Sequence, residues 1–127
     1  MLQEPEIDPR KFVEYSMNPS HPDNRGKWMA FAALGYDVQS TTGRNIAAQN
    51  IIDQLRQSFP TSESTSSTPG KTTIWGVRFQ LRIKIQGLNG RQGDLITNWQ
   101  IDQDKNTPRL ITNWLEVYQE QEPNYES

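Results

Sequence analysis

The sequence predicts an α+β domain, with about three N-terminal helices packed on a three- or four-stranded antiparallel sheet. Apolar residues recur at helical spacing only in the first half of the chain, whereas apolar and polar residues alternate in the second. A hydroxyl-rich segment at 61–71 separates the halves, and its composition predicts a mobile loop. The chain has 127 residues, enough for one core. We therefore expect one domain at 9–117, between a tail at 1–8 and an acidic polar tail at 118–127.

Two short helices are expected near the N-terminus. Asp8 followed by Pro9 is a favourable start, because an N-cap side chain precedes a proline that needs no N–H partner. The first helix should therefore cover about 9–17. The second should begin near residue 24 and end at Gly35, which can adopt the left-handed conformation of a helix C-cap.

A longer helix and three strands complete the predicted fold. Apolar residues recur every three or four positions over 41–58, and Pro60 ends that helix. The strand over 75–85 has the clearest signal, since every odd position is apolar. Asn89-Gly90 then predicts a hairpin turn. Two further strands are expected at about 94–101 and 109–117.

The last two strands repeat the tetrapeptide Ile-Thr-Asn-Trp. If the hairpin is centred on the turn between them, Trp99 lies opposite Thr112, and Thr97 lies opposite Trp114. One sheet face would then carry two threonine–tryptophan pairs. Such a face either stabilises the sheet through cross-strand contacts or offers rings and hydroxyls to a nucleotide.

Composition narrows the chemistry. The chain has no cysteine and one histidine, so we expect neither a disulfide nor a bound metal, and no motif suggests a cofactor. No apolar run approaches the length of a membrane span, and the N-terminus lacks a signal-peptide pattern. The sequence therefore predicts a soluble cytoplasmic protein without a membrane partner.

The formal net charge of −2 argues mildly against a nucleic-acid partner, but the charge is unevenly distributed. The segment 71–91 carries several lysines and arginines and no acidic residue. It is either a solvated strand face or a surface that binds anions. If it binds a substrate, the candidate contacts are Arg78, Arg82, Lys84, Trp99 and Trp114.

His21, the only histidine, lies in a polar turn six residues before Lys27. Histidine side chains exchange protons near neutral pH, and a lysine can stabilise an anion. The pair would suit metal-independent RNA cleavage, in which the ribose 2′-hydroxyl attacks the adjacent phosphate. The simpler interpretation is that His21 belongs to the turn and Lys27 is a solvated charge.

The sequence also resembles a family of small uncharacterised bacterial domains of unknown function, with the pattern N-x-x-H-P-x-x-R-x-K, then T-x-W-x-x-D and P-R-L-x-T. The resemblance spans about 9–117. The order of elements further resembles the barnase–EndoU–colicin–RelE group of small RNase toxins, and that resemblance implies a sheet-face site beside the helices. The positions that match the pattern of the family of unknown function are Asn18, His21, Pro22, Lys27, Leu34, Gly35, Thr97, Trp99, Asp102, Pro108, Arg109, Leu110 and Thr112.

Two functional hypotheses follow. In the first, the protein is a toxin-like ribonuclease or a degenerate relative: His21 is the general acid or base, Lys27 and Arg109 bind phosphate, and Thr97 or Thr112 orients RNA. In the second, it is a non-enzymatic interaction module, or one half of a toxin–antitoxin-like pair that binds a cognate neutralising protein. The position of His21 relative to the sheet discriminates between them, because proton transfer requires hydrogen-bond reach.

Overall fold

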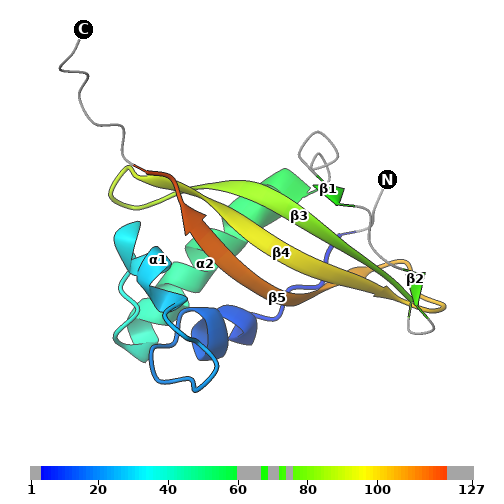
Figure 1. Cartoon of the computed structure of the whole chain (residues 1–127), viewed down its shortest axis with the longest axis horizontal. Coiled ribbons are helices and arrows are strands. Elements are labelled where there is room, and N and C mark those ends of the chain that lie inside the picture. Colours follow the sequence, from blue (N-terminus) through cyan, green and yellow to red (C-terminus); the bar gives the residue numbers. More distant parts are fainter. Residues whose placement is uncertain (1–3, 60–66, 69–71, 74–75, 120–127) are drawn as a thin grey trace, which may run out of the picture.

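The computed structural model describes residues 4–59, 67–68, 72–73 and 76–119, and it confirms the α+β class. Figure 1 shows the helices packed against one face of a long, twisted antiparallel sheet. The helices are η1 (Lys11–Ser16), α1 (Trp28–Ala33) and α2 (Thr41–Ser58). The long strands are β3 (Gly76–Gln86), β4 (Gln92–Asp102) and β5 (Pro108–Val117), and the two-residue strands β1 (Ser67–Thr68) and β2 (Thr72–Thr73) both pair with β3.

The helices differ from expectation mainly at their ends. The longest has the predicted bounds, and the Ser40 hydroxyl caps it by accepting from the backbone N–H of Gly43. The first is shorter than predicted and has the wider hydrogen bonding of a π-helix, with the Met17 N–H donating to the Phe12 carbonyl at 2.9 Å. The second begins four residues later than expected, because Arg25 and the following glycine have positive φ angles that interrupt a helix.

The three predicted strands are present, each with slightly wider bounds where the structure describes them. Asn89 lies in the turn after β3, where its backbone N–H donates to the Leu34 carbonyl and its side-chain amide to that of Ala33. The hairpin turn therefore satisfies carbonyls at the end of α1. The loop predicted at 61–71 lies outside the described residues except for β1.

The predicted register between β4 and β5 is wrong by one residue. Thr97 lies opposite Asn113, and Asn98 lies opposite Thr112. The register then shifts at Trp99, which lies opposite Leu110, so Ile111 is the extra residue of a β-bulge. Because side chains alternate across a strand, this offset places the two threonines on opposite faces of the sheet.

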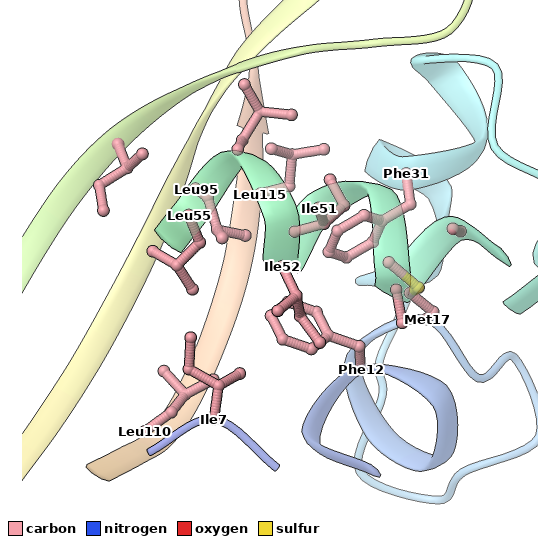
Figure 2. Packing of buried hydrophobic residues seen from close by; sticks show 14 of the residues in the cluster. Ile7, Phe12, Met17, Phe31, Ile51, Ile52, Leu55, Leu95, Leu110 and Leu115 are labelled. Atoms are coloured by element: carbon pink, nitrogen blue, oxygen red, sulfur yellow. The ribbon is translucent and has the colours of Figure 1, made fainter. Parts of the chain in front are cut away.

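The core lies between the helical layer and one sheet face. Figure 2 shows Phe12 and Met17 packing toward Ile51 and Ile52 of α2. The N-terminal segment was expected to be a tail, but Glu6 hydrogen-bonds both Pro108 and Leu110, and Ile7 is buried. Among the described residues, no helix is long and apolar enough to cross a membrane.

Candidate functional site

Asn24, which is 1% exposed, holds the turn that carries His21 in place. Its side-chain amide donates to the carbonyl of Tyr15 at 2.7 Å and to that of Ser16 at 3.1 Å. Its side-chain oxygen accepts from the Trp28 N–H at the start of α1. One asparagine therefore joins η1, the turn and α1, and it holds the turn against the end of η1.

Among the residues that the structure describes, one ring nitrogen of His21 has a hydrogen-bond partner and the other has none. Its Nδ1 accepts a hydrogen bond from the Asp23 N–H at 3.0 Å, so a proton on the neutral ring belongs on Nε2. The ring packs edge-to-face with Tyr15, with centroids 5.1 Å apart. These contacts fix the orientation of the imidazole and leave Nε2 for a ligand.

Lys27 reaches His21 through Tyr15 rather than directly. Its ammonium group lies 4.5 Å from the centroid of the Tyr15 ring and donates to the Tyr15 hydroxyl. Because that hydroxyl oxygen accepts from Lys27, its own proton is free to donate elsewhere. The lysine therefore orients the tyrosine hydroxyl beside His21.

A cavity of about 460 Å³ opens between η1, the His21 turn and β5. On the β5 side its wall is the bulge residue Ile111 and the adjacent Thr112. In the described part of the chain, no hydrogen bond or ion pair engages the side chains of Lys11, Glu14 or Thr112. The full lining is Asp8, Arg10, Lys11, Glu14, Tyr15, His21, Ile111 and Thr112.

Two charged residues that line this cavity, Arg10 and Asp8, form an ion pair. Arg10 forms a two-pronged contact with Asp8, including an Nη2–Oδ2 distance of 2.8 Å. The hydrogen bonds from Arg10 lower the pKa of the Asp8 carboxyl below its ordinary value, so Asp8 stays ionised and paired. Lys11 also lines this cavity, and within the described part of the chain its ammonium group has no ion pair.

Arg109 lies at a second cavity, of about 320 Å³, on the sheet face that points away from the helices. Its guanidinium contacts Asp102, with an Nε–Oδ2 distance of 2.7 Å, and these hydrogen bonds lower the pKa of the Asp102 carboxyl. Arg78 and Gln100 complete the lining. The structure thus separates Arg109 from the His21 cavity.

Thr97 and Trp99 were predicted from the sequence as site residues, but both lie in the core. Both are fully buried on the helix-facing side of β4, where the Trp99 Nε1–H donates to the Thr97 hydroxyl at 2.7 Å. The Thr97 hydroxyl in turn donates to the Leu81 carbonyl. A substrate cannot reach either side chain in this arrangement, so they belong to the core.

The remaining candidates lie on the outer sheet face. Thr112 and Trp114 are partly exposed there, and only Thr112 borders the His21 cavity. Arg82 forms ion pairs with Asp94 and Glu116, both through Nη1, and it lines neither cavity. Lys84 is exposed toward the hairpin end of β3, and it lines neither cavity.

The sequence interpretation missed Tyr15, Lys11 and Glu14 as site residues. They lie within the short helix η1, where a polar face is usually solvent-exposed. The contact between η1 and β5 places that face beside Ile111 and Thr112, and it is a tertiary contact. Among the described residues, no three histidine, aspartate or glutamate side chains group closely enough to hold a metal ion.

A model of a protein family described as a domain of unknown function (DUF6883) matches residues 2–117. The match covers every helix and strand described above. No curated protein and no solved structure matches the chain.

Proposed function

The chain belongs to the DUF6883 family, a domain of unknown function, and from the geometry of its site we propose that it is a ribonuclease acting at the His21 cavity. The reaction is metal-independent cleavage of single-stranded RNA. The ribose 2′-oxygen attacks the adjacent phosphorus, and the bond from phosphorus to the 5′-oxygen breaks. The products are a 2′,3′-cyclic phosphate and a free 5′-hydroxyl.

This reaction requires one group that takes a proton and one that gives a proton. Glu14 lines the cavity without an ion pair in the described part of the chain, so its carboxylate suits the base that accepts the 2′-hydroxyl proton. His21 suits the acid that protonates the leaving 5′-oxygen through Nε2, and for this step the ring is the imidazolium, which forms when Nδ1 releases the Asp23 N–H and takes up a proton. The two roles thus fall on different segments that meet at one cavity.

Negative charge builds on the phosphate oxygens in the transition state and needs donors nearby. Lys11 of η1 and Thr112 of β5 both line the cavity, and their ammonium and hydroxyl groups can donate. The Tyr15 hydroxyl adds a third donor, directed by Lys27. The observation that carries the proposal is this convergence of an acid, a base and donors on one cavity.

We also propose that the protein acts on RNA in the cytoplasm, and that a cognate protein neutralises it by covering the His21 cavity. Such a cover would protect the host RNA. The alternative is a non-enzymatic interaction module, in which the same cavity would bind a partner without chemistry.

Cleavage of end-labelled single-stranded RNA by the purified protein tests the proposal. We expect cyclic-phosphate products from the wild type and a loss of about 10²-fold or more in rate for His21→Gln, the usual range for removing an acid or base. The matched substrate control is the same oligonucleotide with 2′-deoxyribose, which must stay intact because it lacks the nucleophile. Intact RNA in every reaction, or equal cleavage by His21→Gln, would reject the ribonuclease and favour the interaction module.

A further inference from the structure

The second cavity lies on the same sheet face as Thr112, and it has no role in the chemistry above. Arg78, Gln100 and Arg109 form one row across β3, β4 and β5, since Gln100 pairs with both arginines in the strand register. The next row contains Gln80, Asn98 and Thr112 in the same way. Rows two residues apart on a strand are separated by roughly 7 Å.

Hydrogen bonds preorganise the row of two arginines. The Arg78 Nε–H donates to Gln100 Oε1 at 2.8 Å, and the Gln100 amide donates to Asp102. Arg109 binds the same carboxylate through Nε and Nη2. The chain of bonds therefore holds both guanidinium groups in fixed positions around Gln100.

The row keeps unused donors and a positive charge. Arg78 uses only Nε, so within the described part of the chain both of its terminal nitrogens lack a partner. Arg109 keeps Nη1 unpaired on the same terms. Arg78, Arg109 and the nearby Lys105 outnumber Asp102 and Glu6 by one charge.

We propose that this second cavity binds the phosphate of a nucleotide that flanks the cleaved one, so that the RNA strand crosses the outer sheet face from His21 to Arg78. This inference rests on the proposed function. The bulge at Ile111 keeps Thr112 and Arg109 on one face although three positions separate them. Thr112 lines the first cavity and Arg109 the second, so a strand that leaves one reaches the other.

The surface between the two cavities also suits RNA. Gln80 donates to Asn98 at 2.9 Å, and Thr112 lies across the strand from Asn98. These uncharged polar side chains can hydrogen-bond a ribose or a base edge without opposing the phosphate charge. Guanidinium groups bind phosphate oxygens in a two-pronged geometry, so the donors that Arg78 and Arg109 keep unpaired among the described residues suit a phosphate at the second cavity.

Binding measurements on RNA that cannot be cleaved test the proposal independently of catalysis. The probes are a fluorescent tetranucleotide and a dinucleotide, both with a 2′-O-methyl group at the scissile ribose. We expect Arg78→Gln to weaken tetranucleotide binding by about tenfold, the effect of losing one charged hydrogen bond, and to leave dinucleotide binding unchanged. The salt dependence of tetranucleotide binding should also fall by about one counterion.

Arg56→Gln is the matched control, because it removes the same charge from an exposed position on α2, in the helical layer. It should bind both probes as the wild type does. Arg78→Lys keeps the charge but loses the bond to Gln100, and we expect an intermediate affinity.

Equal tetranucleotide binding by Arg78→Gln and the wild type would overturn the proposal, and so would an equal loss for the dinucleotide. Absence of binding by the wild type would also overturn it. If the wild type binds with the expected Arg78 dependence but cleaves no RNA, the ribonuclease proposal fails while the second cavity stands as an RNA phosphate site.

Discussion

His21 stands edge-on to Tyr15, with ring planes at 86°, and the Lys27 ammonium group lies 4.5 Å from the centroid of the same tyrosine ring. The histidine and the lysine of the sequence motif therefore act on one ring, which links them although they do not touch in any described contact. Lys27 is then a positioning residue whose effect passes through the Tyr15 hydroxyl.

Lys27→Ala should lower the rate of RNA cleavage by about tenfold, because the Tyr15 hydroxyl loses the charged donor that orients it. Lys27 does not line the cavity, so the change should appear in kcat more than in KM. Lys27→Arg should restore most of the rate, since a guanidinium can keep both the ring contact and the donor. Steady-state kinetics of the two variants and Tyr15→Phe check this. An Ala variant with wild-type kcat would contradict the positioning role.

Thr97→Val should change stability and Thr112→Val should change the rate of cleavage, because the two threonines face opposite sides of the sheet. Thr97→Val leaves the buried Trp99 Nε1–H without an acceptor, which should lower the free energy of unfolding by about 1–3 kcal/mol. Thr112→Val removes a cavity donor and should slow cleavage while changing stability by under about 0.5 kcal/mol. Urea denaturation and cleavage assays on both variants decide the matter, and the reverse pattern would show that the sheet faces are assigned wrongly.

Asn24→Asp should destabilise the protein by about 1–3 kcal/mol or more. The carboxylate can still accept from Trp28, but it cannot donate to the carbonyls of Tyr15 and Ser16. Asn18→Asp is the matched control in the same turn, since its side-chain amide makes only a 3.3 Å exposed bond to the Glu14 carbonyl. Chemical denaturation should separate the two variants clearly. Similar stabilities would mean that Asn24 does not hold the turn.

Stability should decline below about pH 4 in part because of Asp102. Arg109 holds the pKa of this carboxyl below its ordinary 3.8, so the stabilisation is present above that pH. It is lost as the pH falls through the lowered pKa of the folded state. Asp102→Asn should therefore weaken the acid dependence of the urea midpoint.

The acid dependence should not vanish in that variant, because Arg10 and Arg82 also lower the pKa values of Asp8 and Glu116. Unfolding curves at pH 7 and pH 3 for the wild type and the variant provide the measurement. An unchanged difference between the two pH values would exclude Asp102 as a contributor.

Sequence patterns correctly predicted those strands, helices and turns that show a clear periodicity or turn preference in their own residues. Alternation in β3 reports a half-buried strand, because every second side chain must enter the core. The long helix likewise has a repeating apolar stripe, and Gly90 marks the turn after β3, since its φ of 88° is one that favours glycine. Such signals depend on neighbours in sequence, so they are visible without the tertiary structure.

The site was harder to predict, because it depends on register and on packing between segments. A one-residue difference in the pairing of β4 with β5 decides which threonine is buried, and the bulge at Ile111 has no clear mark in the sequence. Tyr15 contacts both His21 and Lys27, and it is the folded chain that brings the three side chains together.

By itself, the sequence determined the α+β class, the long helix, the three main strands and the selection of His21 and Lys27 as unusual residues. The tertiary structure decided that His21 shares a cavity with Thr112, that Thr97 belongs to the core, and that Arg109 lies at a second cavity. The physical reason is that periodicity and turn propensity act over a few residues. Strand register and the bulge are set by pairing between separate strands, and the packing of η1 on β5 is set by contacts about 100 positions apart, such as the bond from Asn113 to the Lys11 carbonyl.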